Sequence, residues 1–283
     1  MPTSAYKNAL LPLISYPQPT LPAAIAGALD AAVALNLRVV GLNLEINPPI
    51  AAGFSGYAMP IVGTTIDAEE AKTKANAEAI AHEFLAQTKH RELDAELRRT
   101  PCDALDSPGV AAVASRLFDL TIVPIAPQSR ADRELAEAVV FGSGRPVLLL
   151  PPYWAVHITP FDRPLIAWDA TCAAARALSD ALPMLRRARE VFLVTVAPEA
   201  SAMAQTLPDV ERWLNEHGVR VNSARIDADG QSAASAIAAH AKTVRANLMV
   251  MGAFGHSRMR DFILGGVTRS VLAELALPVL FSH

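Results

Sequence analysis

The chain has 283 residues, which as a prior suggests two domains. Hydrophobic residues make up 52% of it, the formal net charge is −3, and neither sign forms a long block, which argues against a protein that binds nucleic acid through its phosphates. Its two cysteines, Cys102 and Cys172, form no CxxC pair and no metal spacing, so we expect two reduced, buried thiols in a cytoplasmic protein and no metal site.

The N-terminus faintly imitates a secretory signal, with Lys7 ahead of the apolar run Ala9–Ile14. That run is short, and a series of prolines interrupts the segment after it, so we expect no signal peptide. No uninterrupted apolar stretch has the length needed to span a bilayer, and we expect no association with a membrane.

Strands and helices are predicted to alternate through the first half of the chain. The expected strands are Ala9–Ile14, Arg38–Leu44, Glu92–Arg98, Asp119–Ile125 and Pro146–Leu150. The expected helices are Ala23–Leu35, Asp67–Lys89, Ser107–Leu117 and Ala131–Phe141. Thr20 is a plausible N-cap for the first helix. The segment Asn47–Thr65 is rich in proline and glycine and is predicted to be an irregular excursion.

The same pattern then starts again. The expected strands of the second half are Pro164–Trp168, Glu190–Val196, Val219–Ile226, Leu248–Met251 and Pro278–Phe281. The expected helices are Thr171–Ala188, Ala202–His217, Ser232–Arg245 and Gly266–Leu275. Gly218 is well suited to end the second of these helices. Two copies of this alternation predict an α/β protein with parallel sheets covered on both faces and right-handed crossovers. We expect one domain over residues 1–152 and the other over residues 160–283.

The stretch Asn247–Thr268 has the pattern of a strand, a glycine-punctuated loop and a helix N-terminus. Gly255 follows Gly252 after two residues, and Gly265 follows after nine more. Glycines allow a backbone to approach a ligand closely, and a helix N-terminus suits phosphate. A plain loop with spare glycines is the alternative.

Position in the sheet favours the ligand loop. Ligands of parallel sheets bind at the carboxyl ends of strands, where the strand order reverses. Asp169 follows the first strand of the second repeat and Gly252 follows the fourth, so these two strands are expected to be neighbours at that point.

The glycine spacing Gly252-x2-Gly255-x9-Gly265 resembles the universal stress protein motif G-x2-G-x9-G-(S/T). The strand that ends in Asp169, with Thr171 two residues later, is similar to that family's first βα turn, and the closing LPVL is similar to its last strand. The resemblance covers the second repeat throughout and the first more loosely. It implies a tandem universal stress protein with two flavodoxin-like (Rossmann-like) parallel-sheet domains.

One branch of that family binds ATP, so the resemblance implies an adenine nucleotide, ATP or AMP, with or without magnesium, in the second domain. Asp169 matches the residue that contacts adenine, and Thr268 matches one close to the phosphates. The implied nucleotide-binding residues are Asp169, Thr171, Val196, Gly252, Gly255, Arg258, Gly265, Gly266, Val267 and Thr268. Gly266 stands where the motif has Ser or Thr, which removes a side-chain contact worth on the order of 1 kcal/mol but keeps a backbone N–H.

The first repeat departs further from the family pattern. Its first strand ends in Ile14-Ser15 where the pattern has an acidic residue, and its fourth strand is followed by no Gly-x2-Gly. We therefore expect no nucleotide in the first domain and a structural role for it. Because the family pairs its last strands across a dimer axis, Pro146–Leu150 is expected to pair with Pro278–Phe281 in an intramolecular pseudo-dimer. A homodimer of the whole chain is a further arrangement.

A few other residues allow two interpretations. Trp168 is expected in the core, with stacking on a base as the alternative. Asp227 and Asp229 favour a turn over a metal site. Arg258 is either part of a cationic rim for phosphate or a residue of a solvated loop. The arginines that follow the first helix of the second repeat are expected to complement that helix dipole. They are Arg186, Arg187 and Arg189.

The resulting functional hypothesis is a cytoplasmic stress-response protein whose second domain binds an adenine nucleotide in a regulatory role. No residue set for efficient hydrolysis is visible in the sequence. The alternative is an interaction scaffold that binds no nucleotide, which Gly266 and the degenerate first repeat favour. An enzyme of adenylate chemistry is a third hypothesis, but it needs a second substrate pocket and an acid or base that the sequence does not indicate.

Overall fold

The computed structural model describes residues 6–48, 59–126, 128–154, 161–197, 201–253 and 275–283, without the side chains of 59–66 and 202. We refer to residues 6–154 as the N-terminal half and to residues 161–283 as the C-terminal half. The elements of the N-terminal half are β1 (Asn8–Ile14), α1 (Pro22–Leu35), β2 (Arg38–Asn47), α2 (Met59–His90), β3 (Ala95–Asp103), α3 (Ser107–Ser115), β4 (Leu120–Pro124), α4 (Arg130–Gly142) and β5 (Val147–Leu150). Those of the C-terminal half are β6 (Pro164–Ala167), α5 (Cys172–Leu185), β7 (Val191–Val196), α6 (Ala202–Gln205), α7 (Leu207–Glu216), β8 (Val221–Ile226), α8 (Ala233–Thr243), β9 (Leu248–Gly252) and β10 (Val279–Ser282).

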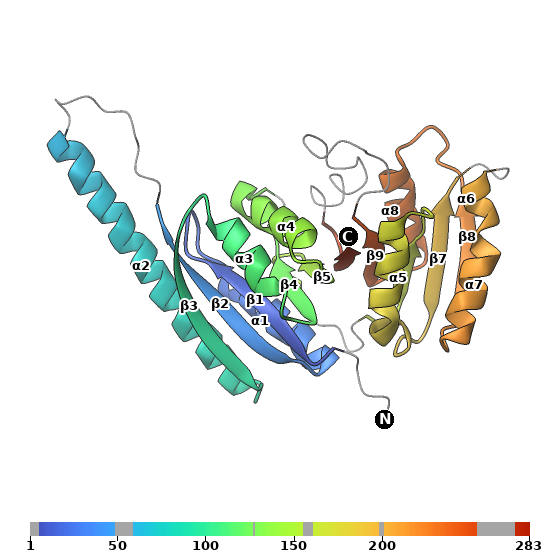
Figure 1. Cartoon of the computed structure of the whole chain (residues 1–283), viewed down its shortest axis with the longest axis horizontal. Helices are drawn as coiled ribbons and strands as arrows, with labels where there is room; N and C mark the ends of the chain where they lie inside the picture. Colours follow the sequence, from blue (N-terminus) through green and yellow to red (C-terminus); the bar gives the residue numbers. More distant parts are fainter. Residues whose placement is uncertain (1–5, 49–58, 127, 155–160, 198–200, 254–274) are drawn as a thin grey trace.

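All of these strands lie in one sheet. Its order across the described residues is β3-β2-β1-β4-β5-β10-β9-β6-β7-β8, so each half contributes five strands in the same order from its own edge (Figure 1). Neighbouring strands are parallel except at the centre, where β10 runs antiparallel to β5 with Val279 opposite Leu149 and Phe281 opposite Val147. The two halves are therefore tandem Rossmann-like units, and the predicted pairing of their last strands is confirmed.

Apolar side chains cover both faces of the sheet. Helices α1, α2, α5 and α7 pack on one face, and α3, α4 and α8 pack on the other (Figure 1). The first layer is continuous across the centre, because Leu148 and Leu150 of β5 belong to the same buried cluster as Ile166 of β6 and Leu178 of α5. The halves thus share a core as well as a sheet.

Side-chain hydrogen bonds also connect the halves. The hydroxyl of the buried Tyr6 donates a hydrogen bond to the carbonyl of Asp180 in α5. The Arg187 guanidinium donates to the carbonyl of Ala34 at 3.1 Å, near the C-terminus of α1. Arg186 in turn donates to the carbonyl of His217 at 2.9 Å. Arg186 and Arg187 therefore contact the C-terminal ends of α7 and α1, and Arg189 pairs with Asp162 at 3.5 Å.

Two predicted boundaries in the N-terminal half are wrong. The predicted strand Glu92–Arg98 is observed as β3 at Ala95–Asp103, because α2 extends to His90 and Glu92 turns the chain at a φ of 51°. The predicted excursion Asn47–Thr65 is already helical from Met59. Pro60 lies in the first turn, where a backbone N–H would have no partner within the helix, so proline is tolerated there. Residues 49–58 lie outside the described residues.

Two further corrections concern helix ends. The predicted helix Ala202–His217 divides at Thr206 into α6 and α7, since Pro208 has no N–H to continue the ladder. Thr20 does not cap α1: its Oγ1 accepts a hydrogen bond from the Ile14 N–H at 2.9 Å, and the N-cap is Leu21. Gly218 follows α7 at a φ of 79°, as its predicted role requires. The predicted helix Gly266–Leu275 lies almost wholly outside the described residues.

Candidate functional site

The predicted site begins at the carboxyl ends of three neighbouring strands. β6 pairs in parallel with β9 on one side, with Ala167 opposite Met251, and with β7 on the other. Asp169 lies two residues beyond β6, Gly252 ends β9, and Val196 ends β7. The predicted adjacency of the Asp169 turn and the Gly252 strand is confirmed. It lies at the switch point of the C-terminal half, where the chain order of the strands reverses.

The turn after β6 is held by Asp169 and Thr171. Asp169 Oδ1 accepts hydrogen bonds from the Thr171 backbone N–H at 3.1 Å and from its hydroxyl at 2.6 Å. Thr171 is the N-cap of α5, and its Oγ1 accepts from the Ala174 N–H at 3.1 Å. The two residues are thus brought together in one turn. Both bonds to Asp169 use Oδ1, and no described residue bonds to Oδ2.

Gly252 lies against the first turn of α5. A Cβ at this position would stand 2.4 Å from the Ala174 nitrogen and 2.5 Å from the Ala173 carbonyl carbon, distances that real Cβ atoms do not adopt. The close approach that demands a glycine here is therefore the approach of α5 to β9. This packing role is sufficient to explain Gly252 without a ligand.

Trp168 and Val196 lie on opposite faces of the sheet. The indole of Trp168 packs against the apolar layer beneath α5 and α7, and its Nε1–H donates to Thr206 Oγ1 at 2.8 Å. Trp168 is thus half-buried against the core rather than enclosed in it. Val196 is half-buried and packs against the other apolar layer.

The remaining residues of the predicted site lie outside the described residues. They are Gly255, Arg258, Gly265, Gly266, Val267 and Thr268. The Asp227–Asp229 segment is the predicted turn: the Asp229 N–H donates to Asp227 Oδ1 at 3.2 Å, and Asp229 and Gly230 have φ values of 47° and 77°. Within the described ranges, no group of three or more His, Cys, Asp or Glu side chains could hold a metal ion.

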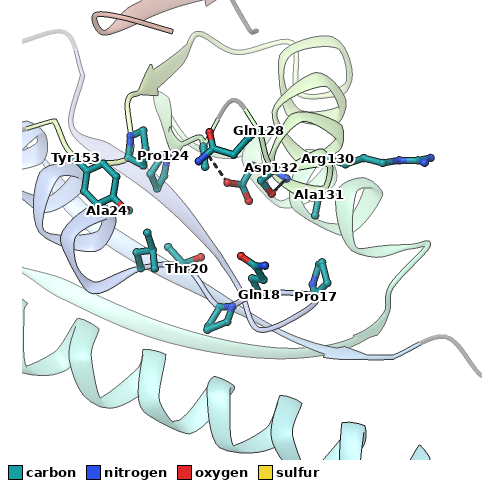
Figure 2. A pocket seen from close by; sticks show the side chains of 15 residues that line it. Pro17, Gln18, Thr20, Ala24, Pro124, Gln128, Arg130, Ala131, Asp132 and Tyr153 are labelled. Carbon is teal, nitrogen blue, oxygen red and sulfur yellow. Dashed lines mark hydrogen bonds between the residues drawn. The ribbon is translucent and has the colours of Figure 1, made fainter. Parts of the chain in front are cut away.

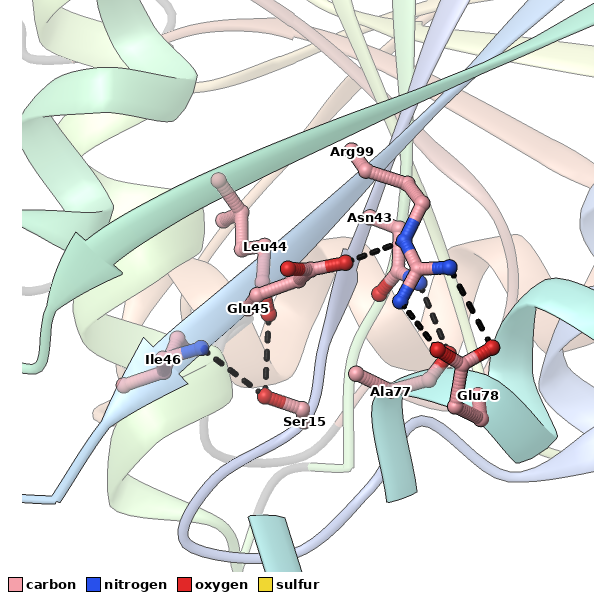
Figure 3. Close-up of polar contacts among 8 residues, drawn as sticks. All are labelled: Ser15, Asn43, Leu44, Glu45, Ile46, Ala77, Glu78 and Arg99. Atoms are coloured by element: carbon pink, nitrogen blue, oxygen red, sulfur yellow. Dashed lines mark hydrogen bonds and ion pairs between the residues drawn. The ribbon is translucent and has the colours of Figure 1, made fainter. Parts of the chain in front are cut away.

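Ser15 stands at the corresponding point of the N-terminal half, just beyond β1. Its side chain is fully buried and bridges to β2, donating to the Leu44 carbonyl at 3.0 Å and accepting from the Ile46 N–H at 2.9 Å (Figure 3). In the same region Asn43 donates to the Ala77 carbonyl of α2 at 2.8 Å, and Arg99 pairs with Glu45 and Glu78. The Ser15 hydroxyl therefore links the end of β1 to β2.

A cavity of about 650 Å³ lies at the carboxyl ends of β1 and β4, the switch point of the N-terminal half (Figure 2). The loops after β1, β4 and β5 form it, and no sequence motif indicated it. The available signal was the capping pair Ser129-x-x-Asp132 directly after a predicted strand. Ser129 Oγ accepts from the Asp132 N–H at 3.2 Å, and an Asp132 carboxylate oxygen accepts from the Ala126 N–H at 2.9 Å.

The two thiols differ in environment. Cys102 is half-buried, and burial, assisted by Asp103 and Asp106, raises its pKa to about 11. Cys172 is exposed at the start of α5, which corrects the expectation that both thiols are buried. It lines an open cavity of about 760 Å³ together with Arg176 and His283.

The chain is similar to known proteins in sequence and in fold. Residues 160–283 match the model of the universal stress protein family. A universal stress protein from Archaeoglobus fulgidus DSM 4304 superposes with a TM-score of 0.69 at 19% identity, over 97% of this chain and 96% of that one. A functionally unknown protein from Pseudomonas aeruginosa PAO1 gives a TM-score of 0.60 at 13% identity, over 99% and 93% of the two chains. At these identities the structures support the tandem fold alone. No curated protein matches the sequence.

Across the ranges described, none of the helices combines the length and the apolar character needed to cross a bilayer.

Proposed function

Because residues 160–283 match the model of the universal stress protein family, we propose that this half of the chain binds an adenine nucleotide, ATP or AMP. The protein would act in the cytoplasm in a stress response, and the role of nucleotide binding would be regulatory rather than catalytic. The proposal includes a division into two domains, residues 1–152 and 160–283, with the nucleotide in the second only.

The observation that carries the proposal is the adjacency of Asp169 and the end of β9 across the β6–β9 pair. The amino group of a base near Asp169 would donate a hydrogen bond to the carboxylate, and a charge-assisted hydrogen bond of this kind is stronger than a neutral one. The phosphates would then follow the segment after Gly252, whose glycine spacing fits the phosphate loop of the family.

The remaining assignments rest on the sequence motif. Thr171 orients Asp169, and Val196 borders the base. Residues 255–268 would hold the phosphates through backbone N–H groups, with or without magnesium. The residues assigned to them are Gly255, Arg258, Gly265, Gly266, Val267 and Thr268.

The test is a calorimetric titration of the full chain with ATP and with AMP. Asp169→Asn is the informative variant, because the amide oxygen can still accept the two bonds from Thr171 while the charge and the second acceptor are lost. We expect it to weaken binding by about tenfold or more, the scale of one lost charge-assisted contact. Asp209→Asn is the matched control, since Asp209 pairs only with its helical neighbour Arg212 among the described contacts, and it should bind like wild type.

Absence of heat for both nucleotides at millimolar concentration would overturn the proposal. Equal affinity of Asp169→Asn and wild type would remove Asp169 from the site. Gly252 variants are unsuitable for this purpose, because a side chain there collides with α5 whether or not a nucleotide binds.

A scaffold that binds no nucleotide is the second candidate function, and one observation favours it. Both Asp169 and Gly252 have structural partners without a ligand: Asp169 holds the Thr171 cap, and Gly252 accommodates α5. Absorbance of the purified protein at the nucleotide band distinguishes the two candidates cheaply. Co-purified nucleotide supports the first, and a nucleotide-free protein that also gives no heat on titration supports the second.

A further inference from the structure

The cavity at the switch point of the N-terminal half has the size of a small-molecule site. Its volume of about 650 Å³ lies within the range of about 300–1,000 Å³ that is usual for ligand pockets. It opens where β1 and β4 run side by side and their following loops diverge, which is where ligands of parallel sheets bind. In Figure 2 the labelled residues come from the loops after β1, β4 and β5 and from the first turns of α1 and α4.

The walls of this pocket are rigid and largely apolar. Prolines from the loops after β1 and β5 and from the end of β4 line it, at positions 17, 19, 124 and 152. The fixed φ of proline limits the conformations of these loops, so they would lose little conformational entropy when a ligand binds. Tyr153 stands at the mouth with 74% of its surface exposed, and its ring is free to lie against a ligand.

The negative charge in the pocket belongs to Asp132, which is half-buried. Its hydrogen bonds come from the Ala126 N–H and from Ser129, both neutral groups. Burial raises its pKa, and these two hydrogen bonds oppose that shift. Arg130, two residues earlier in the helix, pairs with Glu134 at 2.7 Å, and its side chain points away from the pocket (Figure 2).

The same carboxylate makes the pocket a poor site for phosphate. The N-terminus of α4 would otherwise attract an anion, but Ser129 already accepts from its Asp132 N–H and the Asp132 charge occupies that end. A phosphoryl group there would meet a carboxylate of the same sign, which disfavours binding.

We propose that this pocket binds a small organic cation, a primary amine attached to a ring. The ammonium group would donate to Asp132, with Thr20 and Gln128 as neutral hydrogen-bonding groups beside it. The ring would pack on the proline walls and against the face of Tyr153 at the mouth. The proposal concerns the N-terminal half alone and does not depend on nucleotide binding in the C-terminal half.

The experiment is an NMR titration of the full chain with benzylamine, observing the backbone amides of the loops after β1 and β4. Benzyl alcohol and benzoate are the matched probes, because they keep the ring and replace the cation by a neutral group or an anion. We expect shifts at Thr20, Gln128 and Ala131 with benzylamine, binding about tenfold weaker with benzyl alcohol, and none with benzoate.

Two variants locate the contact. Asp132→Asn removes the charge but retains an acceptor for the Ala126 N–H, and it should lower the affinity for benzylamine by about tenfold. Glu134→Gln is its control: it removes a neighbouring carboxylate that faces Arg130, and it should leave the affinity unchanged. Tyr153→Ala should weaken binding severalfold without disturbing the fold, since the ring is largely exposed.

Several outcomes would overturn the proposal. Equal binding of benzyl alcohol would remove the role of charge, and equal loss in Asp132→Asn and Glu134→Gln would indicate general surface attraction. Shifts confined to other parts of the molecule would exclude this pocket. If Asp132→Asn fails to fold, the probe series on wild type and the Tyr153→Ala variant still decide the matter.

Discussion

The nitrogen of Ala174 lies 2.4 Å from the point that a Cβ of Gly252 would occupy, so β9 and α5 meet with no room for a side chain. A glycine that a motif associates with phosphate is thus also required by a helix that crosses the sheet. The two roles can be separated by measuring stability in the absence of nucleotide.

Gly252→Ala should destabilise the protein without any ligand present. The added methyl group forces α5 away from β9, and overpacking of this kind costs about 1–3 kcal/mol. Urea denaturation followed by circular dichroism measures the change. Gly109→Ala is the matched control, because its Cβ would meet nothing within 4 Å and alanine favours the helix that contains it. A Gly252→Ala protein as stable as wild type would contradict the packing role.

Tyr6→Phe should weaken the attachment of the two halves. The buried Tyr6 hydroxyl donates to the Asp180 carbonyl, and burial, with smaller effects of Asp180 and Asp119, raises its pKa and keeps it a donor. Loss of one such bond costs about 0.5–1.5 kcal/mol in the free energy of unfolding. The measurement is again urea denaturation, with the exposed Tyr153→Phe as the control that should show no change.

Asp132 should make stability depend on pH in a defined direction. Burial raises its folded pKa above the ordinary value of 3.8, so the native state binds the proton more tightly than the unfolded state. This contribution to stability is present below the ordinary pKa and is lost as the pH rises through the folded value. Asp132→Asn should therefore gain stability relative to wild type as the pH increases through that window.

Thermal melts of both proteins across the acidic range test this prediction. The melting temperature of Asp132→Asn minus that of wild type should rise from low pH towards neutrality and then level off. A difference that falls with rising pH would show that the hydrogen bonds to Asp132 lower its pKa more than burial raises it. A constant difference would show that the two effects cancel.

The two thiols should react at different rates. The exposed Cys172 is accessible to a disulfide reagent, whereas Cys102 is half-buried and its pKa of about 11 leaves almost no thiolate at neutral pH. We expect one fast-reacting thiol per folded chain and a second only after denaturation. Cys172→Ser should abolish the fast phase, and a fast phase that survives in this variant would contradict the assignment.

Much of the fold follows from the sequence, because apolar runs of strand length alternate with helical spacing in both halves. The adjacency of Asp169 and Gly252 could also be predicted, since the carboxyl ends of neighbouring parallel strands share an edge. The boundaries of β3 could not be predicted, because this edge strand is half-exposed and its charged residues, Arg98 and Arg99, blur the alternation.

The site is less accessible to sequence reasoning for two physical reasons. Glycine spacing indicates a close approach but does not say whether a ligand or α5 makes it, and only the structure identifies the helix at Gly252. The pocket of the N-terminal half draws Thr20 and Tyr153 from two loops and Asp132 from the first turn of α4, so no short motif contains its chemistry.

The antiparallel pairing of β5 with β10 affects both how the sequences of the two halves can diverge and how their junction responds to dilution. Two separate copies that join through identical edges must keep both edges self-complementary, and they come apart on dilution. Here the two edges are different sequences on one chain, and the opposing strand is present at a fixed effective concentration. Each edge is therefore free to diverge, and the junction persists at any protein concentration, which leaves one half able to acquire a chemistry that the other lacks.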